Sequence, residues 1–287
     1  MNQLYKLSGN TGSLWITGVL IGFPLAILIS LIYAYINVYN PIIYLTILVY
    51  FGFLVSIFVV ISLVFRIAKC RSPKNLYIYS VIFGIIVVYS SWCAFLYVFY
   101  SRWGSENIAF SEILSNPLFV IKGVNLLSID GWFTIYEFQI SGWFLWLIWI
   151  IESSIIIFIT TRDDIFLKEE IFCENCNRWA EDIDFNLRLS ATDEVKINTA
   201  IKNKIDILTE IPIAKKNESP HLKVNIHHCS KCDNMSTVDI DLIKLEENKK
   251  GKIVEQKDDY SPVILLTNRL YKNLLSRKEE EEEEKSG

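Results

Sequence analysis

The first 161 residues contain four long apolar runs that are almost free of charge. A helix needs roughly 20 apolar residues to cross the hydrocarbon core, because every backbone polar group must be bonded within the segment. The pattern predicts transmembrane helices over about 14–36, 41–64, 76–100 and 142–161. The first run is too long for a cleavable signal peptide, and a second span follows it almost at once.

The connections between these runs predict an orientation. Residues 38–41 form a short link, so the first two spans make a hairpin. The loop between the second and third spans carries four basic residues and no acid, whereas the long loop 101–141 has only two basic residues. By the positive-inside bias, the basic loop and both chain termini are cytoplasmic. The basic residues are Arg66, Lys69, Arg71 and Lys74 in the first loop, and Arg102 and Lys122 in the second.

The outside loop 101–141 has a pattern of its own. Asn116-Pro117 begins an apolar stretch that reaches Leu127 and predicts a helix lying on the outer surface. Asp130-Gly131 marks a turn, and 132–136 looks extended. An interfacial segment of this kind is typical of a cap over a helix bundle and less often of a partner-binding lid.

After residue 161 the pattern becomes that of a soluble α+β domain, which we place at 162–278. Alternation predicts strands over 222–226 and 238–242 that flank a turn, and a further turn is expected at 248–251. A helix is expected from Asp193 to about Leu208, capped by Thr192. A second helix is expected to start at Ser261-Pro262, from the spacing of Val263, Leu266, Leu270 and Leu274. We expect residues 279–287, with the acidic run Glu279–Glu284, to be a disordered tail.

Charge is shared unevenly between the two parts. Of the 28 basic and 32 acidic residues, only 7 and 5 lie in 1–161, which gives that part a net charge of +2 and leaves −6 on the rest. The apolar part therefore needs a lipid solvent. The acidic balance of the second part argues against nucleic acid as a partner, because phosphates demand a basic surface.

Four of the six cysteines form two Cys-x-x-Cys pairs. These pairs are Cys173 with Cys176, and Cys229 with Cys232. Two such turns supply the four thiolates of a tetrahedral structural zinc site, and the expected cytoplasmic location keeps thiols reduced. Redox chemistry and a rubredoxin-like iron site remain alternatives; iron is disfavoured because Asn177 and Asp233, not glycine, follow the two turns.

The two cysteine turns and the strands near the second pair resemble a zinc ribbon. The resemblance implies a small fold held by one closed metal site that does not catalyse. The departure is the spacing, since 52 residues separate the pairs and compact ribbons have roughly 15–20. We therefore expect a ribbon with an inserted element. His221, His227 and His228 are surplus to a four-sulfur site, and at most one would substitute.

Small residues and a proline predict how the spans pack. Gly18 with Gly22, and Ser80 with Gly84, have the small-x-x-x-small spacing that lets helices approach closely. Pro24 is expected to kink the first span, because proline lacks the N–H of a regular helix turn.

Glu152 is the acid in the middle of a predicted span, and no Lys or Arg lies in any span to pair with it. We expect it to face the bundle and to form a hydrogen-bonded patch with Ser153 and with Ser90 and Ser91 of the third span. One interpretation is a proton or cation site. The other, which the lack of a second carboxylate favours, is polar glue between helices.

The arrangement as a whole resembles small bacterial membrane proteins that carry a trailing cytoplasmic zinc module, and the high Ile, Asn and Lys content fits an AT-rich genome. The resemblance implies the bacterial inner membrane but no named activity. The leading hypothesis is a non-enzymatic scaffold or adaptor that binds a protein partner or a second copy of itself, because the sequence has no catalytic constellation and no phosphate-binding loop. A small transporter or proton-coupled component using Glu152, and a membrane thiol oxidoreductase, are the alternatives.

Overall fold

The computed structural model describes residues 2–40, 42–104, 108–131, 133–135, 138–162, 170–192, 194–202, 204–215, 218–232, 235–247, 253–259 and 261–286. The chain forms two compact units: a helical unit, Ser8–Glu169, and a cysteine unit that joins Met1–Leu7 to Glu170–Gly287. The domain boundary predicted from the sequence, near residue 161, placed the first seven residues in the same domain as the spans. The structure places them with the cysteine unit, because Leu4 forms a β-bridge with Ile264.

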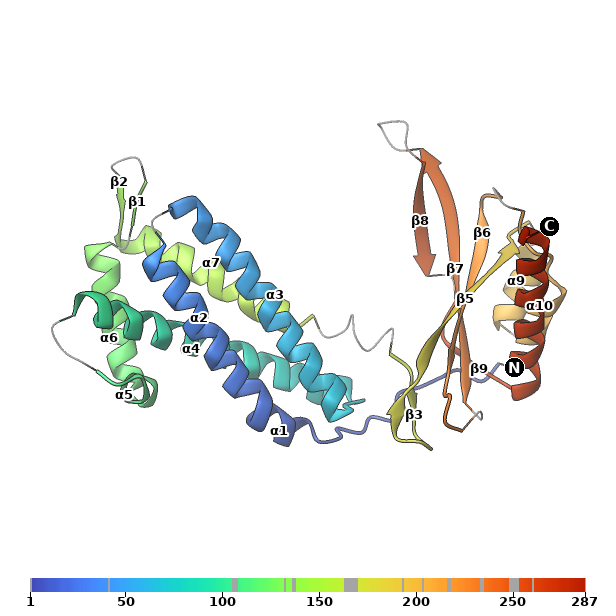
Figure 1. Ribbon diagram of the computed structural model, residues 1–287, viewed down its shortest axis with the longest axis horizontal. Coiled ribbons are helices and arrows are strands. Elements are labelled where there is room, and N and C mark those ends of the chain that lie inside the picture. Colours follow the sequence, from blue (N-terminus) through green and yellow to red (C-terminus); the bar gives the residue numbers. More distant parts are fainter. Residues whose placement is uncertain are drawn as a thin grey trace. The chain divides into compact units, whose positions relative to one another are not determined.

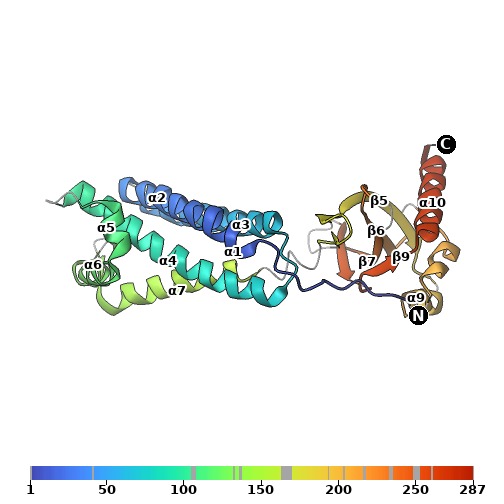
Figure 2. The ribbon, with the colours of Figure 1, turned by 90° about the horizontal axis from the view of Figure 1, so that it is seen from below.

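Four helices of the helical unit are long and apolar enough to cross a membrane (Figures 1 and 2). The first is continuous from α1 (Leu14–Thr17) through η1 (Gly18–Gly22) to α2 (Phe23–Tyr39). The others are α3 (Ile43–Ala68), α4 (Pro73–Trp103) and α7 (Gly142–Thr160). The four runs predicted from the sequence are therefore all helical, and the third continues past Tyr100 to Trp103.

The first helix contains a π-helical turn where a kink was expected. In η1 the N–H of Phe23 bonds to the carbonyl of Gly18, five residues back, and Pro24 follows directly. Because proline has no N–H to donate, the regular bonding pattern is interrupted here in any case. A single π turn is a common local solution to such an interruption within an α-helix.

Gly18, Gly22 and Gly84 of the two small-residue pairs lie where helices approach closely. A Cβ built on Gly18 would lie 2.2 Å from the Tyr79 ring of α4, and one on Gly22 would lie 2.5 Å from the Tyr79 hydroxyl. A Cβ on Gly84 would lie 2.6 Å from the Thr160 hydroxyl of α7. The predicted role of these positions in packing is confirmed.

The segment between α4 and α7 folds into α5 (Phe110–Ser115), α6 (Pro117–Asp130) and a hairpin of β1 (Phe133–Ile135) and β2 (Phe138–Ile140). The helix predicted from Asn116-Pro117 is α6, and Asp130, which was expected in a turn, is its last residue. The position of α6 on the outer surface stays a prediction. Asn116 caps α6 by accepting a hydrogen bond from the Phe119 N–H, and Gly131 has a φ of +77°. One face of α6 packs with α4 and α7, through Val120, Val124 and Leu127.

The chain ahead of α1 is bonded to the loop between α3 and α4. Ser13 donates to the carbonyl of Ala68, and the Arg71 N–H donates to the carbonyl of Asn10. The Arg71 side chain is buried and donates to the Ser8 hydroxyl at 3.2 Å. Gly12 has a φ of +55°, and a Cβ there would lie 1.9 Å from the carbonyl oxygen of Ala68. Residues 8–13 are thus a fixed part of the helical unit.

The cysteine unit is built on an antiparallel sheet in the order β5-β6-β7-β8, with β9 paired to the start of β7. The strands β8 and β9 share one edge of β7, along successive stretches of it. The predicted strands around Cys229 are the longer β6 and β7, whereas β5 has no counterpart in the sequence prediction. The bounds are β5 Glu181–Ser190, β6 His221–His228, β7 Ser236–Glu247, β8 Ile253–Asp259 and β9 Ile264–Leu266.

Helices cover one face of this sheet and close a single apolar core (Figures 1 and 2). The helix expected over 193–208 is instead two elements, α9 (Glu194–Lys202) and the 3-10 helix η2 (Ile205–Glu210). The helix expected from Ser261-Pro262 is also wrong at its start, because Ile264–Leu266 pairs with β7 as β9. The helix α10 (Asn268–Ser286) begins only afterwards, where the Thr267 hydroxyl accepts a hydrogen bond from the Leu270 N–H. The turn expected at 248–251 lies outside the described residues.

The acidic run Glu279–Glu284 continues α10, where a disordered tail was expected. Leu270 and Leu274 are buried in the core and anchor the first turns of this helix. Once those turns are fixed, extension adds one hydrogen bond per residue, and Glu and Lys are good helix formers. The acidic run is therefore helical because it extends a helix whose first turns are already fixed.

Gly18→Ala should destabilise the helical unit, by about 1–3 kcal/mol, because overpacking a tight contact costs that much. The new methyl would meet the Tyr79 ring, which is buried and contacts Phe23, Phe65 and Phe83. The measurement is thermal unfolding of the full chain in detergent. Gly52→Ala is the matched control, since a Cβ there meets nothing within 4 Å; equal melting of both variants would contradict the packing argument.

Candidate metal centre

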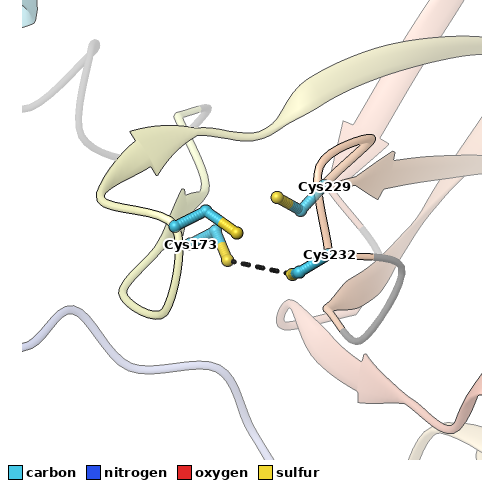
Figure 3. A group of neighbouring side chains, drawn as sticks. Cys173, Cys229 and Cys232 are labelled. Carbon is cyan, nitrogen blue, oxygen red and sulfur yellow. Dashed lines mark hydrogen bonds between the residues drawn. The ribbon is translucent and has the colours of Figure 1, made fainter.

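Four cysteine sulfurs from two distant parts of the chain gather at one point. The Sγ atoms of Cys173, Cys176, Cys229 and Cys232 all lie within 4.8 Å of one another. Cys229 and Cys232, on the turn between β6 and β7, face Cys173 on the opposite hairpin (Figure 3). Cys173 and Cys229 are buried and the other two are half-buried. The structure thus brings together the four residues that the sequence predicted.

The first pair lies in a hairpin of β3 (Phe172–Cys173) and β4 (Arg178–Trp179). Asn177 follows Cys176 with a φ of +51°, a left-handed conformation. Asparagine is among the few residues besides glycine that adopt it routinely. Asn177 therefore takes the place that glycine has in rubredoxin-like turns, so its identity does not separate zinc from iron. Asp233 lies outside the described residues.

The second pair is held by the pairing of β6 with β7. His228 lies opposite Ser236, and the N–H of Cys229 donates to the carbonyl of Met235 at 3.0 Å. The His228 ring also bonds to the Ser236 hydroxyl at 2.9 Å and stacks on Tyr271 of α10. These contacts fix the backbone on which Cys229 sits.

Glu181 joins the two cysteine turns, and sequence reasoning did not single it out. Its Oε1 atom accepts hydrogen bonds from Arg178 at 3.1 Å, beside the first turn, and from Ser230 at 2.8 Å, within the second. An acid at the start of a strand carries no sequence signal of this role, because its two partners are 3 and 49 residues away.

The pKa values of both thiols in the first pair are raised. Burial raises the pKa of Cys173, and the pKa of Cys176 rises to about 12, chiefly because its thiol hydrogen-bonds to Cys232. A redox-active cysteine needs the opposite, a pKa lowered by nearby positive charge or a helix N-terminus. A bound divalent cation would reverse the effect, since metal ligation requires thiolates.

This arrangement could hold one metal ion in tetrahedral coordination by four sulfurs. Zinc and iron both accept such a set, and it leaves no open position for a substrate. The histidines bond elsewhere: His227 to Asp239 at 2.9 Å, His221 to Arg188 and to the Glu218 carbonyl, and His228 to Ser236. Burial and the charge of Arg188 lower the pKa of His221.

The polar patch predicted between the third and fourth spans is not arranged as expected. The Ser90 hydroxyl bonds to Ser30 of α2 at 3.0 Å, and Ser91 donates to the Val88 carbonyl of its own helix. Glu152 is half-buried on α7, and its carbonyl accepts a hydrogen bond from Tyr50 of α3 at 2.8 Å. Ser153, also half-buried, follows Glu152 on the same helix.

Comparison of the chain with protein-family models, with curated proteins and with solved structures gives no match.

Cys229→Ser should abolish metal binding by the purified full chain, which we expect to carry about one metal ion. A serine hydroxyl stays protonated and is a poor ligand for a site built from thiolates. Metal per chain is measured by elemental analysis, which also identifies the ion. Cys70→Ala is the matched control, because Cys70 is buried in the helical unit and is not a member of the group of four cysteines. Full metal content in Cys229→Ser would refute the site.

Proposed function

We propose that this chain is an integral membrane scaffold or adaptor, whose cysteine unit is held by structural zinc and docks a protein partner. The observation that carries the proposal is the closed cluster of four sulfurs within 4.8 Å in a chain with four long apolar helices. A closed site stabilises a fold and leaves no position for catalysis. The partner is a cytoplasmic protein or a second copy of the chain.

A rigid polar surface on the cysteine unit supports a docking role. On β6 and β7, the side chains that alternate with the core residues are polar and bond to one another. Asn225 donates to Asp239 at 2.9 Å and to Asp241 at 2.6 Å, and His227 bonds to Asp239. Lys257 of β8 pairs with Asp241 at 3.1 Å. Side chains fixed in this way lose little entropy when a partner binds.

The same network bears on which partner chemistry fits. Asp239 keeps its charge, because hydrogen bonds from His227 and Asn225 lower its pKa although burial opposes them. With the net charge of −6 beyond residue 161, this favours a protein over a nucleic acid.

The expected location is the bacterial inner membrane, with both termini in the cytoplasm. The basic loop after α3 supports this orientation through the positive-inside bias. The bonding of Leu4 to Ile264 also supports it, because the two ends of the chain then share one compartment. That compartment keeps thiols reduced and available to a metal.

Purification of the full chain from its native membranes should yield a partner cross-linked to peptides of residues 170–287. Cys229→Ser should lose that partner while the protein stays in the membrane, because metal loss unfolds only the cysteine unit. The measurement is cross-linking followed by peptide mapping. A partner retained equally by Cys229→Ser, or cross-linked only to the helical unit, would contradict docking by the cysteine unit.

A second candidate is a proton or cation pathway through Glu152. The observation that favours it is the position of Glu152, half-buried within α7, where the Tyr50 hydroxyl of α3 donates to the Glu152 backbone carbonyl at 2.8 Å. An acid within a span is costly and is by default a candidate functional group.

Under this second candidate, Glu152→Gln should abolish proton or cation flux into vesicles that contain the protein, because glutamine cannot exchange a proton. Melting temperature and metal content should stay unchanged. Ser154→Ala is the control, since Ser154 is exposed on the same helix and bonds only to the Ile150 carbonyl among the contacts described. Equal flux in Glu152→Gln and wild type would leave Glu152 as a helix-packing residue.

A further inference from the structure

Residues 3–5 pair with β9 of the cysteine unit as a short strand would, through one isolated β-bridge and its neighbouring backbone hydrogen bonds. Leu4 bridges Ile264 of β9 in antiparallel fashion. The N–H of Tyr5 donates to the carbonyl of Val263 at 3.0 Å, and the N–H of Leu265 donates to the carbonyl of Gln3 at 2.8 Å. The strand β9 is therefore paired on both sides, with β7 on one edge and the chain start on the other.

Asn2 fastens the end of this strand to the helical layer. Its Nδ2 atom donates to the carbonyls of Ala200 and Ile201 in the last turn of α9, both at 2.7 Å. Its Oδ1 atom accepts from the N–H of Ile205, the first residue of η2, at 2.9 Å. Backbone groups at helix ends lack partners within the helix, and one amide side chain here satisfies groups of both kinds.

Tyr5 connects the strand to the metal centre. Its hydroxyl accepts a hydrogen bond from the N–H of Phe172 at 3.0 Å and lies 3.4 Å from the Phe172 carbonyl. Phe172 is buried and directly precedes Cys173. The hydroxyl of a residue near the N-terminus thus holds the backbone beside the first of the four cysteines.

The hairpin that carries Cys173 is short. Its strands β3 and β4 are two residues each, and an isolated two-stranded hairpin is marginally stable at best. Among the contacts described, the hairpin is held by the bond from Arg178 to Glu181, by the Phe172–Trp179 ring contact and by Tyr5, and a bound metal would add to them. If one of these contacts is lost, the position of the hairpin depends more strongly on the others.

We propose that residues 2–5 are a latch whose docking on the cysteine unit is coupled to metal binding through the Tyr5–Phe172 hydrogen bonds. This inference rests on the proposed metal site. Metal at the four cysteines fixes the backbone of Phe172 and so presents the groups that Tyr5 binds. By reciprocity, a docked latch strengthens metal binding by the same factor.

The latch lies at one of the two chain connections between the units. Lys6 and Leu7 alone separate it from Ser8, where the helical unit begins, and residues 8–13 are bonded to the loop between α3 and α4. Loss of metal would release residues 2–5 and lengthen this connection. The metal would thereby control how tightly the cysteine unit is tied to the first span.

The test uses the zinc-loaded full chain in nanodiscs and two variants. Tyr5→Phe removes the hydroxyl and keeps the ring, and should transfer zinc to a chromogenic chelator about tenfold faster, as loss of such outer-sphere partners commonly does. Gln3→Ala is the matched control, because Gln3 is exposed and its backbone carbonyl makes the bond; it should transfer zinc at the wild-type rate. Asn2→Asp, which loses both donors to α9, should also speed the transfer.

The reciprocal measurement is hydrogen exchange at the amides of Tyr5 and Leu265, which donate across the latch. Both should be protected in the zinc-loaded protein and should exchange at least about tenfold faster after chelation, while amides of α4 stay unchanged. The coupling would be overturned if Tyr5→Phe released zinc at the wild-type rate, or if chelation left the exchange rates of the latch amides unchanged. Neither result would contradict the zinc site itself. A wild-type chain that binds no zinc would overturn both.

Discussion

The approach of four cysteine sulfurs to within 4.8 Å is the constraint on which the cysteine unit depends. Two of them come from a hairpin of two-residue strands and two from the turn between long strands, with 52 residues between the pairs. The pKa of the Cys176 thiol is raised to about 12, chiefly by its hydrogen bond to Cys232. A divalent cation bound by the four sulfurs would link the short hairpin to the sheet.

Around that link, the sheet and its helical layer are ordinary antiparallel α+β structure. Core residues of β5, β6, β7 and β9 pack against α9, η2 and α10. The 52 residues between the cysteine pairs supply a whole strand, β5, and the helices α9 and η2, which contribute to the same apolar core. The metal centre lies at the end of β6 and β7, and the latch reaches it through Tyr5.

The sequence allowed prediction of features set by local pattern and missed those set by distant contacts. The spans follow from uncharged apolar runs, and the metal ligands from Cys-x-x-Cys spacing.

Strand β5 carried a usable signal, because Ile183, Phe185, Leu187 and Leu189 alternate. The start of α10 was placed too early, because Val263 and Leu266 match helical spacing with Leu270 although 264–266 is a strand. The partners of Glu152 and Ser90 depend on how each helix is rotated about its axis. A span that is apolar on all sides carries no sequence signal of that rotation. The side chains of Tyr5 and Asn2 bond to residues 167 to 203 positions away, so no local pattern points to them.

The position of the chain start also limits how the helical unit can cross a bilayer. Residues 2–5 and β9 belong to one sheet, so both lie on the same side, and the number of crossings between Ser8 and Glu169 must be even. Four apolar helices satisfy this condition. The helix α6 is also largely apolar, but its 14 residues span only about 21 Å, short of the roughly 30 Å hydrocarbon core. Counting it as a crossing would give five and separate the strand from its partner. An apolar pattern and a β-bridge between residues 260 positions apart thus support the same topology.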